Sequence, residues 1–374
     1  MRTILFGNPQ KDNLLDLRTL VSTIFAGFLL AMLPVWGFGQ TDWASPLKKC
    51  WEFSSPEMTR FSPASDNAYI FISTSKGSIL AINQSSGAIE WTADLGGNFR
   101  TDLDVINGRL FATAIFDSRG SNSTVIRKVN SLTGVPFWRY SGDEDRLTYL
   151  SADKEQNIYL ADPRGVIISL TKLGEVRWKS VFETGITTPL RYHGPQILVG
   201  TSSNSLIVID RETGRISSQV NLSRTPSSLR VSDEGRIFVG DERGEVYGYT
   251  AEFSRIWKAK TGAGVTQIDV FRGDPIVISK DNFVYRISAA SGKKLWKRKL
   301  AGRIFGGVMV DSMHQVFLTS GASTAIILNL TNGNLINKID FDAPFVSAPI
   351  RTQTGFAVPT ETGIASVAAG NCKN

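Results

Sequence analysis

Cysteine and histidine are both scarce in this sequence. Its 374 residues include two cysteines and two histidines. Cys50 and Cys372 lie near opposite ends of the chain, so no Cys-x-x-Cys redox motif and no cysteine zinc cluster is present. His193 and His314 are too few for a histidine-rich metal site. Each lies in a polar turn, and we interpret both as surface residues and not as catalytic bases.

The common catalytic motifs are missing as well. The sequence has no Gly-x-Ser-x-Gly elbow, no phosphate-binding Gly-x-x-x-x-Gly-Lys-Ser/Thr loop and no His-Glu-x-x-His pair. No segment after Gly39 shows the apolar period of a long amphipathic helix. We therefore expect an all-β chain, and we assign no residue a catalytic, cofactor-binding or metal-binding role.

One long apolar run occurs, at residues 20–39, and basic residues precede it. Small residues at its end offer a cleavage point, so residues 1–39 are interpreted as a secretory signal peptide. Because the run is about as long as a bilayer-spanning helix, an uncleaved membrane anchor is the alternative. A lipoprotein signal needs a cysteine at the cleavage point, and the first cysteine is Cys50, so no lipid anchor is expected. Either interpretation predicts an exported protein, periplasmic or secreted.

The charge balance is mildly basic. Lys and Arg number 41 against 34 Asp and Glu, a formal net charge of +7. Such a charge suits weak association with an anionic membrane surface, although solubility alone also explains it. The densest basic segment, KKLWKRK at residues 293–299, is interpreted as an outer strand whose lysines protect a solvated edge, with an anionic membrane as the alternative. Nucleic acid is not an expected partner outside the cytoplasm.

A repeat of about 40 residues, the length of a four-stranded propeller blade, organises the chain after residue 40. In the clearest copy, AINQSSGAIEW at residues 81–91, an apolar strand leads through a glycine turn into a strand with tryptophan. The fifth copy is one residue shorter, and we place Ser254 where the others have glycine. The six further copies occupy residues 128–138, 169–178, 208–218, 248–257, 286–296 and 326–337.

The repeat gives its tryptophans and glycines structural roles. Glycine permits the positive φ of the tight turn, and the regular position of tryptophan favours packing between neighbouring blades over binding of a sugar or flat cofactor. The turn glycines are Gly87, Gly134, Gly174, Gly214, Gly292 and Gly333. The blade-docking tryptophans are Trp51, Trp91, Trp138, Trp178, Trp257 and Trp296.

An eighth copy is divided between the two ends of the chain. Residues 361–367 match the strand before the turn, and residues 48–53 match the strand after it. Pairing them closes a ring and leaves no open sheet edge. We therefore predict one eight-bladed β-propeller over residues 40–374, with four-stranded antiparallel blades and a last blade completed by an N-terminal strand. On this template Cys50 and Cys372 are close, and we predict a disulfide between them, with two buried free thiols as the alternative.

The frame Ala-x-Asn-x-x-x-Gly-x-x-x-Trp, matched in full at residues 81–91, resembles the repeat of the pyrroloquinoline-quinone-like propeller family. One branch contains quinone-dependent dehydrogenases, which need calcium and, in many members, adjacent cysteines that this sequence lacks. The other is non-catalytic and includes the outer-membrane barrel-assembly protein BamB. This branch is similar in length and blade number, and the resemblance implies binding of a partner chain through loops or an edge strand.

The resemblance also points to candidate partner-binding residues. The barrel-assembly branch has a Leu-Ser-Leu-Arg run, and the nearest match is Leu222-Ser223-Arg224, one residue short, with Leu222 and Arg224 as the candidates. The pair of aspartates that accompanies the run is missing from residues 261–266. We expect a monomeric, non-enzymatic scaffold without cofactor that binds another envelope or secreted protein, and the resemblance implies a role in outer-membrane or envelope protein assembly. The alternative is a degenerate quinoprotein or other small-ligand enzyme that uses the central channel.

Overall fold

The computed structural model describes residues 41–55, 57–58, 60–99, 101–106, 109–118, 121–142, 149–320 and 323–372. The predicted signal peptide or anchor, residues 1–39, lies outside them. Residues Asp42–Asn374 form one compact unit. Within the described part of the chain, no helix is long and apolar enough to cross a membrane.

Eight antiparallel sheets, the blades, make up this unit, and each is written here from its inner to its outer strand. Blade 1 consists of β2 (Ala64–Ser65), β3 (Tyr69–Ser73), β4 (Ser78–Asn83) and β5 (Ile89–Asp94), and blade 2 consists of β6 (Asn98–Phe99) with β7 (Asp104–Ile106), β8 (Arg109–Ser118), β9 (Ser121–Asn130) and β10 (Pro136–Gly142). Blade 3 consists of β11 (Tyr149–Ala152), β12 (Ile158–Ala161), β13 (Val166–Leu170) and β14 (Val176–Val181), and blade 4 consists of β15 (Arg191–His193), β16 (Gln196–Thr201), β17 (Ser205–Asp210) and β18 (Ile216–Asn221). Blade 5 consists of β19 (Pro226–Val231), β20 (Ile237–Asp241), β21 (Glu245–Tyr249) and β22 (Arg255–Lys260), and blade 6 consists of β23 (Val265–Phe271), β24 (Asp274–Ser279), β25 (Phe283–Ile287) and β26 (Lys294–Lys299). Blade 7 consists of β27 (Ile304–Met309), β28 (His314–Thr319), β29 (Thr324–Asn329) and β30 (Leu335–Asp340), and blade 8 consists of β31 (Ile350–Arg351), β32 (Gly355–Thr360), β33 (Gly363–Ala369) and β1 (Leu47–Ser54).

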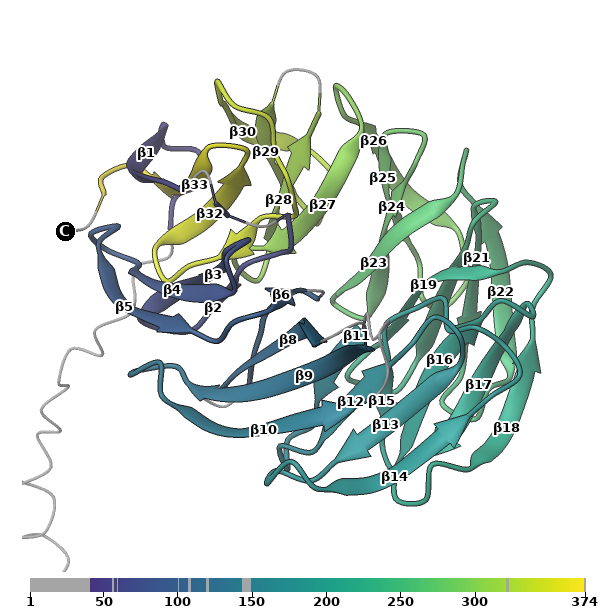
Figure 1. Ribbon diagram of the computed structural model, residues 1–374. Helices are drawn as coiled ribbons and strands as arrows, with labels where there is room; N and C mark the ends of the chain where they lie inside the picture. The colour runs from purple at the N-terminus through teal and green to yellow at the C-terminus, as the bar shows by residue number, and fades with distance from the viewer. Residues whose placement is uncertain are drawn as a thin grey trace, which may run out of the picture. The chain divides into compact units, whose positions relative to one another are not determined.

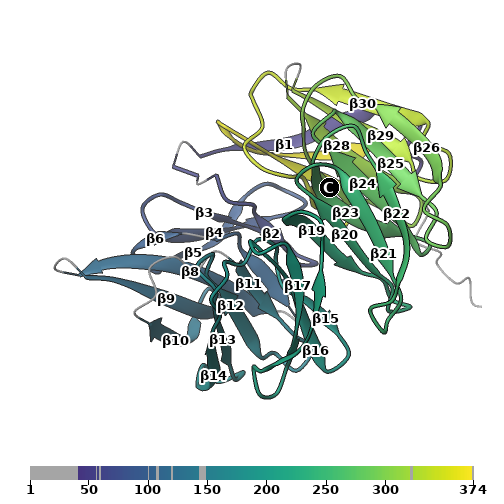
Figure 2. The same ribbon diagram turned by 90° about the vertical axis from the view of Figure 1, so that its right-hand side faces the viewer.

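The predicted eight-bladed propeller is confirmed, including its closure. β1 pairs antiparallel with β33, from Leu47 opposite Ala369 to Ser54 opposite Gly363, with a shift of register between Lys49 and Trp51. Figure 1 shows this purple N-terminal strand beside the yellow C-terminal strands, and Figure 2 shows the blades from the side. Blade 2 alone has its inner edge in two pieces, because β6 and β7 both pair with β8.

Burial of the strands follows their place in the blade. All five residues of β20 and all six of β32 are buried. Their side chains point alternately to two neighbouring blades, so both faces of a middle strand must be apolar. Outer strands such as β26 have instead alternating exposed and half-buried residues. The same logic explains why the β-branched runs of the sequence occupy the second and third strands of each blade.

The apolar core is divided into eight clusters, one at each junction between consecutive blades. At the junction of blades 8 and 1, for example, Ile70 and Ile72 of blade 1 pack with Ala357 and Ile364 of blade 8. Every blade therefore contributes to two clusters. The ring is held by side-chain packing on both sides of each sheet, and no blade is an unpacked end.

Candidate functional site

Two faces of the ring carry different connections. The hairpin face carries the turns between the first and second and between the third and fourth strands of each blade. The crossover face carries the turns between the second and third strands and the links from one blade to the next. Loops on these faces and the outer strands are the surfaces that a partner can reach, because the middle strands are buried.

Six tryptophans join neighbouring blades at the hairpin face. Each lies on the outer strand of one blade and donates its indole N–H to a backbone carbonyl in the hairpin of the next. The Nε1 to O distances are 2.8 Å for Trp51 to Gln84, 3.0 Å for Trp91 to Ser131, 2.8 Å for Trp138 to Lys172, 2.9 Å for Trp178 to Arg211, 2.7 Å for Trp257 to Ala289 and 3.0 Å for Trp296 to Leu330. The indole N–H groups of these six tryptophans therefore have hydrogen-bond partners inside the propeller.

The turn glycine of the receiving blade lies under each of these indoles. All six have φ between +70° and +87°. A Cβ added to any of them would come within 2.5 to 2.9 Å of a tryptophan ring atom. Each position therefore needs glycine twice, for the left-handed backbone and for the close approach of the ring. We call this pair of contacts the Trp–Gly dock. The pairs are Trp51 with Gly87, Trp91 with Gly134, Trp138 with Gly174, Trp178 with Gly214, Trp257 with Gly292 and Trp296 with Gly333.

Two of the eight junctions lack the dock. Blade 7 has Asn337 at the tryptophan position, and its Nδ2 donates to the carbonyls of Trp43, at 3.0 Å, and Ser45, at 2.7 Å. Blade 4 has Ser218 there. Blade 5, which would receive it, has no glycine in its hairpin, and the positive φ of +64° is found at Phe253. The assignment of Ser254 to the turn position was therefore wrong.

Histidine replaces tryptophan at the junction of blades 4 and 5. His193, the last residue of β15, has its Nε2 2.9 Å from the Ala251 carbonyl oxygen, and Nε2 must be the donor because a carbonyl only accepts. Its ring meets that of Phe253 edge-on, with centroids 5.9 Å apart. The half-buried His193 is thus a structural contact between two blades, and the other histidine, His314, begins β28 with Nδ1 2.9 Å from Asp311 Oδ2.

The predicted partner-binding residues lie at this same junction, on the crossover face. They form the link between β18 and β19. Leu222 is half-buried at the edge of the cluster between blades 4 and 5, and its N–H donates to the Asn204 carbonyl at 2.8 Å. Arg224 is exposed. The backbone of the link is therefore tied to blade 4 at Leu222, and the Arg224 side chain lies at the surface.

The outer strand that leads into this link is unusual in chemistry. β18, with the sequence ISSQVN, contains no charged residue, and five of its six residues are exposed. It is the last strand of its sheet, so one side of its backbone faces no other strand of the blade. An uncharged edge strand is the kind to which another chain adds by backbone hydrogen bonding, whereas lysines on an edge oppose it. β18 and the link to Arg224 make one continuous surface, which we call the blade 4 edge.

Charged side chains line the inner strands of the ring. Asp104 of β7, Arg191 of β15, Arg230 of β19 and Asp269 of β23 interact electrostatically. Burial raises the pKa of Asp104 to about 6. Burial likewise raises the pKa of Asp269 and lowers that of Arg191. These four half-buried side chains give the inner strands a polar, charged lining.

Most of these inner groups already have partners. The Asp269 carboxylate accepts hydrogen bonds from Gln315 Nε2 at 2.6 Å and Gln267 Nε2 at 2.7 Å. Arg191 donates to the carbonyls of Leu229 and Leu190, each at 3.1 Å. Asp104 and Asp269, which belong to blades 2 and 6, both interact electrostatically with the Arg191 guanidinium. Among the described residues, no group of three or more His, Cys, Asp or Glu side chains is placed to hold a metal ion.

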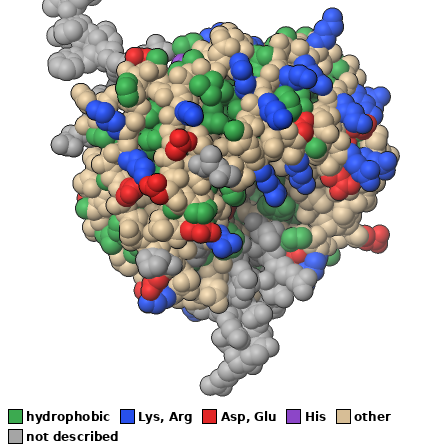
Figure 3. Space-filling model, turned by 90° about the horizontal axis from the view of Figure 1, so that it is seen from above, with side chains coloured by type: hydrophobic (Ala, Val, Ile, Leu, Met, Phe, Trp, Pro, Cys, Tyr) green, Lys and Arg blue, Asp and Glu red, His purple; other side chains and the backbone are tan. Residues whose placement is uncertain are grey.

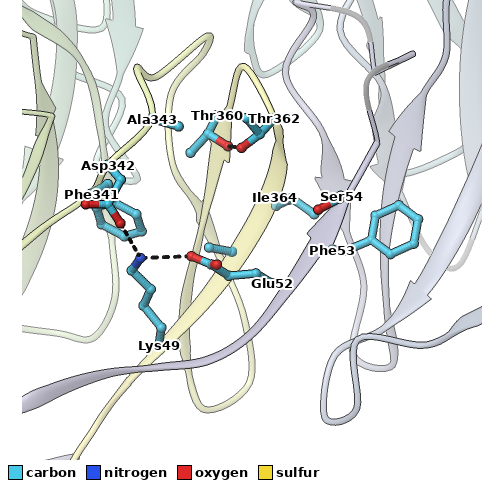
Figure 4. A pocket seen from close by; sticks show the side chains of 11 residues that line it. Lys49, Glu52, Phe53, Ser54, Phe341, Asp342, Ala343, Thr360, Thr362 and Ile364 are labelled. Atoms are coloured by element: carbon cyan, nitrogen blue, oxygen red, sulfur yellow. Dashed lines mark hydrogen bonds and ion pairs between the residues drawn. The ribbon is translucent and has the colours of Figure 1, made fainter.

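A cleft of about 260 Å³ opens on the crossover face of blade 8 (Figure 4). Lys49 of β1 enters it and pairs with Glu52 at 2.9 Å and Asp342 at 3.7 Å. The ammonium also lies 5.3 Å from the centre of the Phe341 ring. Because these contacts neutralise the one cation, the cleft presents a closed charge network and not an open anion site.

A wider hollow of about 680 Å³ lies on the hairpin face across blades 3 to 5. Arg211 lies there between Asp153, at 3.8 Å, and Glu155, at 3.5 Å. His193 also borders it. The Arg211 guanidinium is thus neutralised by two carboxylates of blade 3.

The two cysteines form a disulfide across the closing blade. Cys50 and Cys372 are bonded, with Cα atoms 5.4 Å apart and a sequence separation of 322. The bond joins β1 to the chain just after β33. The prediction of a bridge is confirmed, and the alternative of free thiols is excluded because both cysteines are used.

The repeat, the split eighth blade and the docks can be compared with known proteins. The family model described as "Outer membrane protein assembly factor BamB" matches residues 39–189 and 202–360. The chain belongs to this family. This match confirms the resemblance to the pyrroloquinoline-quinone-like propeller family that the sequence predicted. No curated protein sequence matches the chain.

Solved structures agree on the fold. The crystal structure of BamB from Moraxella catarrhalis has a TM-score of 0.69 and 13% identity, covering 86% of this chain and 99% of that one. The computationally designed Ika8 protein has a TM-score of 0.72 and 14% identity, covering 85% of this chain and 99% of its own. At these identities the likeness concerns the fold alone. A designed protein among the neighbours underlines that a propeller by itself implies no function.

Proposed function

We propose that this chain is a non-enzymatic scaffold of the cell envelope that binds a partner protein through the blade 4 edge, in the assembly of outer-membrane proteins. The observation that carries the proposal is the coincidence of an uncharged outer strand, β18, with an exposed arginine, Arg224, at one junction without a Trp–Gly dock. Membership in the BamB family supports the role in assembly.

The recognition follows from ordinary strand chemistry. A partner strand added to β18 forms backbone hydrogen bonds along its free edge, and the serine and glutamine side chains tolerate a range of partner sequences. Arg224 then selects a carboxylate at one end of the added strand, because its guanidinium forms two parallel hydrogen bonds. Leu222, half-buried behind it, supports the link.

The proposal also includes the compartment and the oligomeric state of the protein. The protein works outside the cytoplasm, in the periplasm or attached to a membrane by residues 20–39, as a monomeric propeller without cofactor. Its partner is another envelope or secreted protein and not a nucleic acid.

The test is recovery of the partner by the full tagged chain from its own cell envelope, after crosslinking, read by mass spectrometry. We expect one protein in stoichiometric amount, and we expect Gln219→Lys combined with Arg224→Glu to lose it. Thr92→Lys is the matched control, because Thr92 occupies in β5 the position of Gln219 in β18, five residues after the turn glycine, and both are exposed. Equal recovery by both variants would refute the blade 4 edge.

The inner channel supports a second candidate function. The buried Asp104, with its pKa raised to about 6, and the cationic Arg191 favour a small-ligand enzyme of the degenerate quinoprotein type. Titration of the purified chain with quinone and calcium, followed by absorbance, tests it. Saturable binding that Arg191→Gln abolishes would support the enzyme and count against the scaffold.

A further inference from the structure

Two neighbouring outer strands carry matched rows of positive charge. β22 (RIWKAK) and β26 (KLWKRK) have cations at corresponding positions, counted from the docking tryptophan of each strand. All are exposed. The matched pairs are Arg255 with Lys294, Lys258 with Lys297 and Lys260 with Lys299. We call these six side chains the cationic face. Figures 1 and 2 show both strands at the outside of consecutive blades.

The cationic face contains no compensating carboxylate of its own. Neither β22 nor β26 has an acidic residue, whereas the corresponding strand of blade 1, β5, has Glu90 and Asp94. In the described part of the chain, one ion pair involves the face, Lys258 with Glu245 at 2.8 Å. Figure 3 shows Lys and Arg gathered toward one side of the molecule. The two strands together carry seven cations and no carboxylate, which is the densest positive charge on two neighbouring outer strands.

Apolar side chains are exposed within the same face. Ile256 of β22 is 40% exposed and Leu295 of β26 is 52% exposed, and each lies directly before the docking tryptophan of its strand. A long basic side chain precedes each of them, Arg255 and Lys294, and such a side chain can cover apolar surface with its stem while its charge stays in water. A mixture of lysine, arginine and exposed leucine or isoleucine suits the boundary between headgroups and acyl chains.

We propose that the cationic face is a second interaction surface, which docks the propeller on anionic phospholipid headgroups. This surface is distinct from the blade 4 edge and does not depend on it. Lysines on an outer strand oppose addition of a partner strand, and outward positions of β22 and β26 offer no Asn, Gln, Ser or Thr for specific recognition of a protein. Charge complementarity with a fluid anionic surface requires neither.

The experiment uses the full chain and reads lysine accessibility, so attachment by any other segment does not interfere. The protein is acetylated with vesicles of phosphatidylcholine, and again with vesicles that also contain phosphatidylglycerol. We expect slower acetylation of Lys260, Lys297 and Lys299 on the anionic vesicles alone, with reversal by salt. Lys48 and Lys172, exposed on blades 8 and 3, should react equally on both. Equal rates for all five lysines on the two vesicles would overturn the proposal.

Variants of equal net charge provide the second measurement. Lys260, Lys297 and Lys299 changed together to Gln should weaken the salt-sensitive binding to anionic vesicles by on the order of 100-fold. The matched control changes three exposed cations elsewhere, Lys48, Arg139 and Lys172, to Gln. If both triple variants weaken binding to anionic vesicles equally, net charge alone explains the effect and the proposed role of the cationic face is wrong. If an acidic protein from the envelope protects the lysines and anionic vesicles do not, the lipid assignment is wrong.

Discussion

The indole of Trp51 lies on Gly87, where a Cβ would come within 2.7 Å of ring atom Cδ2. Trp51 belongs to the outer strand of blade 8 and Gly87 to the hairpin of blade 1. The junction at which the ring closes is therefore joined by the same dock as five others. Closure of the ring therefore involves a residue pair in the first quarter of the sequence.

Alanine at a docked glycine should be far more harmful than alanine at a free one. In Gly214→Ala the new Cβ would lie 2.5 Å from Trp178 Cε3 at a φ of +71°. We expect backbone strain and overpacking to lower the free energy of unfolding by about 2 to 4 kcal/mol. Urea denaturation of the purified protein measures this.

Gly194→Ala is the control, since its φ is +57° and nothing lies within 4 Å of the added Cβ. Backbone strain alone should lower its free energy of unfolding by about 1 kcal/mol. If the two variants lose the same stability, the close approach of the indole has no energetic effect.

The disulfide should stabilise the ring by constraining the unfolded chain. It closes a loop of 322 residues, so its removal in the Cys50→Ser, Cys372→Ser double variant is expected to lower the free energy of unfolding by up to about 5 kcal/mol. Reductant should bring the urea midpoint of the parent protein down to that of the variant and leave the variant unchanged. An unchanged parent midpoint in reductant would contradict the role of the bridge.

Asp104 should make stability depend on pH. Its pKa rises from 3.8 to about 6 on folding because burial disfavours the carboxylate. The folded state therefore holds the proton more tightly, and this contribution is complete below about pH 4 and is lost as the pH rises through about 6. Asp104→Asn, which stays neutral, should gain up to about 3 kcal/mol over the parent between pH 4 and pH 7.5. Parallel curves of unfolding free energy against pH would show that Asp104 is not buried as described.

His193 should hold the junction of blades 4 and 5. In His193→Ala the hydrogen bond to Ala251 O and the edge contact with Phe253 are both lost. We expect about 1 to 2 kcal/mol less protection from hydrogen exchange in the hairpin of residues 250–254. His314→Ala, in blade 7, should leave exchange in that hairpin as it is. Faster exchange there in both variants would argue for general loosening of the ring.

The sequence was sufficient for the fold because the repeat carries it. Spacing between glycine and tryptophan marks the hairpins of blades 1, 2, 3 and 6, and the match of residues 361–367 with residues 48–53 predicts the closure and the disulfide. Ser254 falls at the turn position only when the fifth copy, which is one residue shorter, is aligned from its first residue. Counting back from Trp257 reaches Phe253, just as counting back from Trp178 reaches Gly174, so the signal was present.

Other features were beyond the reach of the repeat. Asp104, Arg191 and Asp269 come from three different blades, and their meeting depends on the register of inner strands that share no motif. The use of His193 in place of tryptophan is equally hidden, because the residue it replaces lies on β18 and its acceptor lies in blade 5. Unlike the Trp–Gly docks, these contacts involve residues outside the repeat frame, so the repeat does not predict them.

The strand order of blade 8 determines when this sheet can form during synthesis of the chain. Its outer strand is made first and its other three strands last, so this sheet cannot exist until the whole chain has been synthesised. Until then the strand that carries Cys50 has no sheet to join and Trp51 belongs to an incomplete blade. The disulfide between Cys50 and Cys372 is consequently expected to form only after the last blade has assembled. The fraction of chains that contain it therefore measures the fraction of molecules with a closed ring.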